Sequence, residues 1–261
     1  MNFYCSFYIP GDRERERVKA IIMFRLDNKV VVITGGGSGI GKAISTTFAK
    51  QGAIVYILEM DEKNAASTVE EITTEGGKGS FFKCNIANQQ EVKTVIAQIA
   101  QKHETIDVLV NNNSNAQIGQ ADTTAEEDFD RIVAVNIKGV YNCLHEAIPF
   151  MKLKGGSILN MASVAALVGI ADRFVYSAAK GAVAAMTLSV AKDYIGDNIR
   201  CNCISPARVH TPFVDGYLAK NYPGREEEMF EKLSKTQPIG RMAKPVEIAH
   251  LALYLCSDEA S

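Results

Sequence analysis

The sequence has 261 residues, of which 47% are hydrophobic and 22% charged, and its formal net charge is −2 at pH 7. A chain of this size can bury a large core, and its balanced charge offers no case for binding nucleic acid or a membrane, so we expect neither partner. The six cysteines show no C-x-x-C spacing, and no apolar run reaches the roughly 18 residues of a membrane span, so we expect a cytoplasmic protein with no metal site.

The first 22 residues differ in character from the rest of the chain. A short apolar stretch is followed by a charged run at 11–17. The charges follow the apolar part and no small-residue cleavage site closes it, so this is not the pattern of a signal peptide. We expect residues 1–22 to be an extension outside the fold and residues 23–261 to form one domain.

From residue 30 onward, short apolar runs alternate with amphipathic segments. Strands are expected at 30–34, 53–59, 80–84, 106–111, 157–161 and 199–204. Helices are expected at 39–51, 61–75, 89–103, 136–152, 175–194 and 245–256. The polar, proline-containing region 206–236 is expected to be a mobile flap. Apolar strands that alternate with helices predict a single doubly wound, Rossmann-type α/β domain, with a parallel sheet covered by helices on both faces.

A glycine-rich loop, T-G-G-G-S-G-I-G at 34–41, joins the first strand to the first helix. Glycines let the backbone approach a pyrophosphate, and the helix N-terminus offers free N–H groups to it. The expected pyrophosphate site comprises Gly35, Ser38, Gly39, Ile40 and Gly41. Glu59 ends the second strand, where a carboxylate accepts ribose hydrogen bonds and repels a 2′-phosphate. NAD is therefore expected as the cofactor, with NADP less favoured.

Further motifs follow in a characteristic order: N-N at 111–112, Asn136 within V-N-I-K-G, Ser163, and Tyr176 four residues before Lys180. Together with the glycine loop they resemble the short-chain dehydrogenase/reductase family, from about residue 26 to the end of the chain. A hydride-transfer site needs a group that takes the hydroxyl proton, and a nearby Lys180 cation would lower the pKa of Tyr176 for that task. Ser163 would stabilise charge on the substrate oxygen.

The resemblance implies further roles. Lys180 would also bind the nicotinamide ribose, and Asn136 would hold a water in a proton relay. The remaining residues implied in cofactor binding are Asn85, Ile86, Asn112, Tyr176, Pro206, Val209 and Thr211. The resemblance also implies a homo-oligomer, a dimer or homotetramer, with the helices at 136–152 and 175–194 on the dimer face.

The sequence departs from the family pattern in four places. Asn113 and Ser114 stand where the family has small residues, Asn85 replaces an Asp, and Ala207 replaces a Gly. The sequence also ends before the family's last strand, so we expect the sheet to lack that strand and to have an exposed edge.

Three arginines, Arg173, Arg208 and Arg241, come from separate segments and could converge on a substrate carboxylate. The segments 172–173, 199–203 and 240–241 are similar to those in the cytosolic type of 3-hydroxybutyrate dehydrogenase and in the bacterial dehydrogenases of 2-keto-3-deoxy-fuconate and fucose. The expected function is an NAD-dependent oxidoreductase that interconverts a secondary alcohol and a carbonyl on a sugar, sugar acid or small hydroxy acid. Two alternatives stay open: a 3-oxoacyl or ketone reductase of the same fold, and a truncated, non-catalytic family member.

Overall fold

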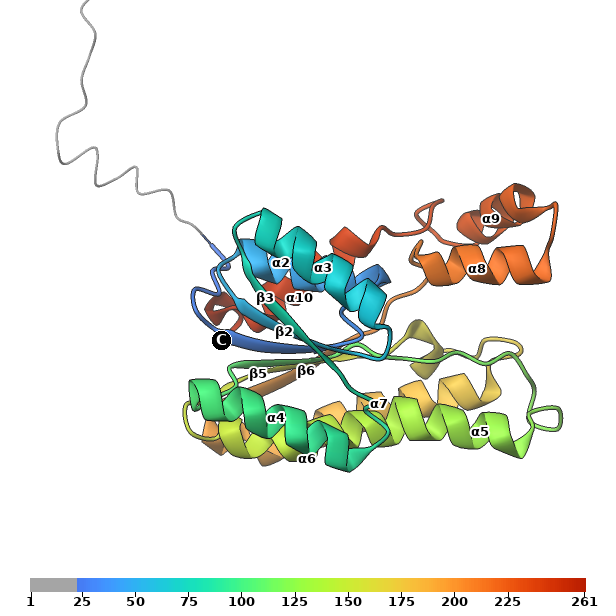
Figure 1. The fold of residues 1–261 in the computed structure, drawn as a ribbon. Helices are drawn as coiled ribbons and strands as arrows, with labels where there is room; N and C mark the ends of the chain where they lie inside the picture. The colour runs from blue at the N-terminus through green and yellow to red at the C-terminus, as the bar shows by residue number, and fades with distance from the viewer. Residues whose placement is uncertain (1–22) are drawn as a thin grey trace, which may run out of the picture.

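The computed structural model describes residues 23–261, and the expected extension at residues 1–22 lies outside this part of the chain. One sheet lies between two layers of helices (Figure 1). Its six strands are parallel and lie in the order β3-β2-β1-β4-β5-β6. They are β1 (Val30–Thr34), β2 (Ile54–Glu59), β3 (Lys78–Lys83), β4 (Val108–Asn111), β5 (Gly156–Met161) and β6 (Ile199–Ile204). The expected doubly wound fold is confirmed, and β6 is the edge strand of the described sheet.

The central strands are buried on both faces. Every residue of β1 is buried, and alternate side chains belong to different cores: Val31 and Ile33 to one, Val30 and Val32 to the other. Because both faces are apolar, each must be covered by helices. Helices α2, α3 and α10 cover one face, and α4, α6 and α7 cover the other (Figure 1).

The helices follow the strands along the chain, with short helical turns η2 (Val164–Ala166), η3 (Ile195–Asp197) and η4 (Asp258–Ala260) between or after them. The helices are α2 (Gly39–Lys50), α3 (Glu62–Thr74), α4 (Gln89–His103), α5 (Glu126–Val133), α6 (Gly139–Met151), α7 (Phe174–Asp193), α8 (Pro212–Asn221), α9 (Glu226–Lys235) and α10 (Pro245–Cys256). The expected helix at 245–256 is matched residue for residue. The other expected elements agree within two residues, apart from two regions.

Region 206–236 is the first difference, because it contains two helices rather than an irregular flap. Pro212 occupies the first turn of α8, where a missing N–H costs nothing. Helix α9 has an acidic first turn and a basic last turn, which suits the helix dipole, and the adjacent pair Arg225–Glu228 adds an ion pair. The proline and the charged helix ends can be read in the sequence, but the apolar periodicity of this region is too weak to indicate helices. Both helices stand beside the sheet's carboxyl end (Figure 1).

The helix expected at 136–152 is the second difference. Helical structure begins ten residues earlier, at Glu126 in α5, and continues through a π-helical segment, η1 (Ala134–Lys138), into α6. Asn136 therefore lies in the π-helical segment and not at the start of a helix. π-Helical turns of this kind often occur at functional sites.

Helix α7 is long and apolar on average, although Lys180 interrupts its apolar run. Within residues 23–261, it is long and apolar enough to cross a membrane by length and composition alone. It also packs against β5 and β6 and contains the buried Lys180, which is the environment of a core helix. We therefore assign α7 to the layer of helices that covers the sheet, with one face buried against β5 and β6.

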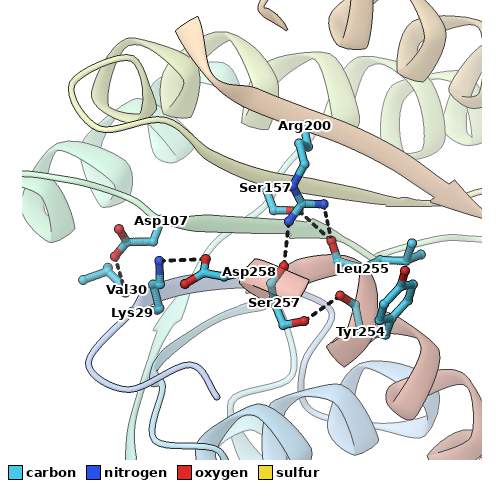
Figure 2. Close-up of polar contacts among 9 residues, drawn as sticks. All are labelled: Lys29, Val30, Asp107, Ser157, Arg200, Tyr254, Leu255, Ser257 and Asp258. Carbon is cyan, nitrogen blue, oxygen red and sulfur yellow. Dashed lines mark hydrogen bonds and ion pairs between the residues drawn. The ribbon is translucent and has the colours of Figure 1, made fainter. Parts of the chain in front are cut away.

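The amino end of the sheet has a set of polar contacts that tie the C-terminal segment to the strands (Figure 2). The guanidinium of Arg200 on β6 donates to the carbonyl oxygens of Leu255 at 2.7 Å and Ser257 at 2.9 Å. The hydroxyl of Ser157 on β5 donates to the same Leu255 carbonyl at 3.1 Å. These donors satisfy carbonyl groups that α10 leaves without partners at its C-terminus.

Candidate active site

The turn after β1 carries the glycine loop into the N-terminus of α2. Gly35 and Gly39 have φ values of +65° and +52°, which favour glycine, and a Cβ on Gly41 would collide with the carbonyl oxygen of Gly35. Ser38 precedes α2 and makes no side-chain cap, so the first-turn N–H groups can bind an anion. The loop therefore fits a dinucleotide pyrophosphate, which supports the expectation for this motif.

Glu59 lies beside the glycine loop at the carboxyl end of β2. Its carboxylate accepts hydrogen bonds from the backbone N–H of Met60 at 2.9 Å and from that of Gly37 at 3.4 Å. These contacts hold a negative charge next to the loop. The arrangement fits a ligand with hydroxyl donors at this position better than one with a second anionic group.

The segment after β4 is held in place by its neighbours on both sides. The side-chain amide of Asn112 donates to the carbonyls of Thr34 and Gly35, and the backbone N–H of Asn113 donates to the Thr34 hydroxyl at 3.1 Å. The side-chain amide of Asn136 makes two hydrogen bonds with the backbone of Asn115. Its oxygen accepts from the Asn115 N–H at 2.8 Å, and its nitrogen donates to the Asn115 carbonyl oxygen at 2.7 Å. The structure thus places Asn136 as a support for this segment, whereas its role in a proton relay stays a prediction.

A cavity of about 580 Å³ opens at the carboxyl end of the sheet. Of the expected site residues, it is lined by Ile40, Asn112, Ser163, Arg173, Tyr176, Lys180, Pro206, Arg208, Val209 and Thr211. Segments far apart in the sequence therefore meet in one place, as the doubly wound fold requires of its ligand site. Its size is within the usual range for a small-molecule site.

Tyr176 and Lys180 lie one turn apart on α7 and face this cavity. The Lys180 ammonium nitrogen lies 5.7 Å from the centroid of the Tyr176 ring and donates to the carbonyl oxygen of Met161 at 2.6 Å. Burial lowers the pKa of Lys180 to about 8, because desolvation penalises the ammonium. Lys180 therefore changes charge close to physiological pH.

The pKa of Tyr176 differs from the sequence expectation in sign. Burial raises it, and this effect exceeds the lowering by the hydrogen bond with Ser163, the charge of Arg173 and the hydrogen bond with Ser114. Lys180, which was expected to lower this pKa, has its ammonium on the Met161 carbonyl instead. In this structure Tyr176 is therefore a neutral phenol at pH 7, suited to give a proton.

Ser163 follows β5 and caps the short turn η2. Its hydroxyl oxygen accepts from the backbone N–H of Ala165 at 3.2 Å, and its side chain is buried beside Tyr176. The Ser163 hydroxyl can therefore still donate to an oxygen in the cavity. A hydroxyl and a phenol at one place can together polarise a carbonyl or bind an alcohol.

The three arginines do not converge. Arg173 lines the cavity and stacks over the ring of Tyr217 at 6.0 Å, and Arg208 also lines the cavity. Arg241 instead makes a bidentate ion pair with Glu247, with both N–O distances at 2.7 Å, and is not among the lining residues. Arg173 and Arg208 can therefore contact a substrate in the cavity, whereas Glu247 holds the Arg241 guanidinium elsewhere. Substrate contact by these residues stays a prediction.

Asn85 and Ile86, expected to flank the adenine, are not among the residues that line the cavity. Asn85 accepts from the N–H of Ala87 at 3.1 Å and so shapes the turn before α4. Ile86 is a buried core residue against which Gly139 packs closely. Their contact with adenine stays a prediction.

Sequence reasoning missed several residues that line the cavity. They are Ala116, Ile118, Ile170, Asp172, Phe213, Tyr217 and Gln237. Phe213 and Tyr217 belong to α8, a helix in the region for which the sequence predicts an irregular flap. Asp172 has a φ of +57°, and its carboxylate accepts a hydrogen bond from the side-chain amide of Gln120. No local sequence motif predicts this arrangement.

Comparison with known proteins shows to which family the chain belongs. A family model described as "Enoyl-(Acyl carrier protein) reductase" matches residues 35–261. The chain is 37% identical to the 3-oxoacyl-[acyl-carrier-protein] reductase of Thermotoga maritima over 91% of this chain and 94% of that protein. The chain belongs to the short-chain dehydrogenase/reductase family.

Two solved structures of a dehydrogenase and a reductase are also similar to this chain. The aldohexose dehydrogenase of Thermoplasma acidophilum, in ligand-free form, is 31% identical, has a TM-score of 0.81 and matches 90% of this chain and 89% of its own. The L-sorbose reductase of Gluconobacter frateurii, solved with NADPH and L-sorbose, is 26% identical, has a TM-score of 0.87 and matches 91% and 92%. This short-chain dehydrogenase/reductase is thus an oxidoreductase that acts on alcohols or ketones with a nicotinamide cofactor.

Proposed function

We propose that the protein is an NAD-dependent dehydrogenase that interconverts a secondary alcohol and its carbonyl. The observation that carries this proposal is that Ser163, Tyr176 and Lys180 lie in one cavity beside a glycine loop that fits a pyrophosphate. The nicotinamide cofactor supplies or accepts the hydride. The protein's own residues bind the reacting oxygen and move its proton.

Each of these side chains has a distinct task. Ser163 donates to the substrate oxygen and stabilises the charge that develops there. Tyr176 gives a proton to that oxygen in reduction and removes it in oxidation. Lys180 holds a buried positive charge near the phenol and contacts Met161, which fixes its position against β5. The balance of burial and hydrogen bonding at Tyr176 favours proton donation at neutral pH.

Glu59 supports NAD as the cofactor. Its carboxylate lies at the glycine loop, where it can accept from ribose hydroxyls and would repel a 2′-phosphate. The L-sorbose reductase relative was solved with NADPH, so cofactor preference has to be argued from this chain's own residues. We propose that the carboxylate of Glu59 sets the preference for NAD.

Fluorescence titration of the purified protein with NADH and NADPH tests the cofactor proposal. We expect saturable NADH binding and at least roughly tenfold weaker NADPH binding, the ratio that 1.4 kcal/mol of repulsion produces. Glu59→Gln keeps the size of the side chain without its charge and should reduce that ratio. Equal binding of both cofactors by the unaltered protein would overturn the NAD assignment. Binding of neither would favour a non-catalytic member of the family.

For the substrate we propose a sugar, a sugar acid or a small hydroxy acid. Arg173 and Arg208 supply positive charge at the cavity, and two structural relatives are named for an aldohexose and for L-sorbose. If a carboxylate binds Arg173, Arg173→Ala should raise KM about tenfold or more for acidic substrates and little for neutral sugars. Equal increases for both classes would contradict an acidic substrate.

A 3-oxoacyl reductase is the second candidate, because a relative of this name is 37% identical. The apolar lining residues Ile118, Ile170 and Phe213 could contact an acyl chain. Turnover of a 3-oxoacyl thioester with NADPH in preference to NADH would favour this candidate over a sugar dehydrogenase.

We also propose a homo-oligomer, a dimer or tetramer, in the cytoplasm. Tyr141 on α6 and Phe174 and Leu188 on α7 are large apolar side chains exposed on the helices expected to form the dimer face. Light scattering coupled to size-exclusion chromatography tests this. A mass near the 28.4 kDa of one chain would contradict it.

A further inference from the structure

Arg173 lies directly before α7, where a second segment of the chain holds its backbone. The N–H of Gly119 donates to the carbonyl oxygen of Asp172 at 3.1 Å, and the N–H of Phe174 donates to the carbonyl oxygen of Gly119 at 3.2 Å. Gly119 and Arg173 form an isolated parallel bridge. The segments that follow β4 and β5 are therefore joined at Arg173, so its side chain starts from a fixed position beside the cavity.

The guanidinium of Arg173 has a charge that its neighbours do not neutralise. The adjacent Asp172 carboxylate accepts from the side-chain amide of Gln120 at 2.9 Å, and Arg173 takes part in no ion pair within residues 23–261. Its Nη1 makes only a long contact of 3.4 Å with the carbonyl oxygen of Asp172. Most of the guanidinium N–H groups can therefore donate to an anion in the cavity.

The ring of Tyr217 on α8 packs against this guanidinium. The Arg173 Cζ lies 6.0 Å from the ring centroid. The ring is itself held, because Tyr222 packs edge-on against it with centroids 6.0 Å apart and the adjacent Leu218 is buried. An aromatic face attracts a cation without occupying any of its N–H groups. The contact therefore restricts the arginine side chain and leaves its donors available.

We propose that Tyr217 is a positioning residue that holds the Arg173 guanidinium in place to bind the carboxylate of an acidic substrate. This inference rests on the proposed function and narrows it, because it selects a sugar acid or hydroxy acid over a neutral sugar. A flexible arginine loses conformational freedom when it binds a ligand, and the stacked ring restricts it before the ligand arrives. The edge of the guanidinium can then form two parallel N–H···O bonds with a carboxylate.

Tyr217→Leu tests the proposal by comparing acids with their uncharged amides as substrates. The probes are 3-hydroxybutyrate with 3-hydroxybutyramide, and gluconate with gluconamide, each assayed with NAD. Leucine removes the aromatic face, so the KM of an acid should rise roughly threefold to tenfold. The KM of the amide and both kcat values should change little. Tyr217→Phe keeps the ring and should keep the original preference for the acid.

Phe213→Leu is the matched control on the same helix. Phe213 also lines the cavity, but within residues 23–261 no cation–π contact joins it to Arg173. Its replacement should therefore change the KM of an acid and of its amide by the same factor. If Tyr217→Leu also changed both by the same factor, the tyrosine would only shape the cavity and the proposal would be overturned.

A double-mutant cycle shows whether Tyr217 acts through Arg173. In an Arg173→Ala background, Tyr217→Leu should not change the ratio of the acid KM to the amide KM any further. A further change would overturn the proposal, because the tyrosine would then act without the arginine. If Tyr217→Leu does not fold, Arg173→Lys keeps the charge but removes the planar group that stacks, and it should raise the KM of the acid selectively.

Calorimetric titration of the full-length protein with the same probes, with and without NADH, does not depend on turnover. We expect an acid to bind more tightly than its amide and Tyr217→Leu to reduce the difference. This result in a protein that oxidises none of the probes would support the Arg173–Tyr217 site while the proposed dehydrogenase function fails. Turnover of alcohols without any preference for an acid, or the absence of acid binding in both conditions, would overturn this inference alone.

Discussion

The two ends of the sheet use polar groups in opposite ways. At the amino end, Arg200 and Ser157 donate to carbonyls that would otherwise lack partners, and Asp107 accepts from the N–H of Val30 at 2.7 Å (Figure 2). At the carboxyl end, Ser163 and Ser114 keep donor capacity that faces the cavity. Completed hydrogen bonds hold the strands and α10 together, whereas incomplete ones are available to a ligand. The comparison predicts that stability and activity can be altered separately.

Tyr176→Phe should give the largest effect. It keeps the ring and removes the proton-transfer group, so we expect kcat to fall about 10³-fold. The melting temperature should change by no more than about 2 °C, because only hydroxyl contacts are lost. Steady-state kinetics and thermal unfolding measure the two. A kcat within about tenfold of the original would exclude Tyr176 as the proton donor.

Arg200→Met should give the converse result. The side chain loses two hydrogen bonds from a charged donor to backbone carbonyls, and we expect the free energy of unfolding to fall by about 2–4 kcal/mol. kcat and KM should not change, because Arg200 lies at the opposite end of the sheet. Arg208→Met is the matched control at the cavity, and it should alter KM with little effect on denaturant unfolding. If Arg200→Met lowered kcat while leaving stability intact, the separation of the two ends would be wrong.

The pH dependence should separate the two directions of the reaction. Because burial raises the pKa of Tyr176 above its ordinary value, the phenolate is scarce at neutral pH. Oxidation requires the phenolate, so its kcat should increase about tenfold per pH unit below about pH 8, and less steeply above it, where Lys180 loses its charge. Reduction requires the phenol and should proceed at full rate at neutral pH. Initial rates in both directions between pH 6 and pH 10 test this prediction, which a flat oxidation profile would contradict.

Lys29→Ala should give the smallest effect. Lys29 and Asp258 form an ion pair at 3.3 Å, but the Asp258 side chain is 80% exposed (Figure 2). We expect a loss of less than about 1 kcal/mol at low salt. The difference from the unaltered protein should disappear at about 1 M salt, where the pair is screened. A larger, salt-independent loss in chemical denaturation would mean that Lys29 stabilises the sheet in another way.

The strands and the glycine loop could be predicted because their signals are local and strong. A run such as 30–34 has to be buried, and a glycine cluster between strand and helix has few other uses. The candidate catalytic residues Ser163, Tyr176 and Lys180 belong to recognisable motifs, and the structure brings them to one cavity. By contrast, α5, α8 and α9 were missed, since each of these helices buries only one or two residues.

The electrostatics of the site could not be predicted from spacing. Spacing places Tyr176 and Lys180 on one face of a helix, but it does not reveal that the Met161 carbonyl takes the ammonium. Likewise, Arg241 forms an ion pair with Glu247, six residues later in the first turn of α10. This ion pair holds the Arg241 side chain outside the cavity lining. Competition between partners depends on side-chain positions in three dimensions.

The π-helical segment Ala134–Lys138 has a consequence for insertions and deletions. A π-helical turn contains more residues than an α-helical turn, so the loss of one residue there lets regular α-helical winding resume while α5 and α6 keep their buried faces. The protein would still fold. Asn136 would lose its two hydrogen bonds with the backbone of Asn115, and these bonds would no longer hold the segment that contains Ser114 in place. A deletion of this kind would therefore yield a folded protein whose active-site segment after β4 is no longer held in place.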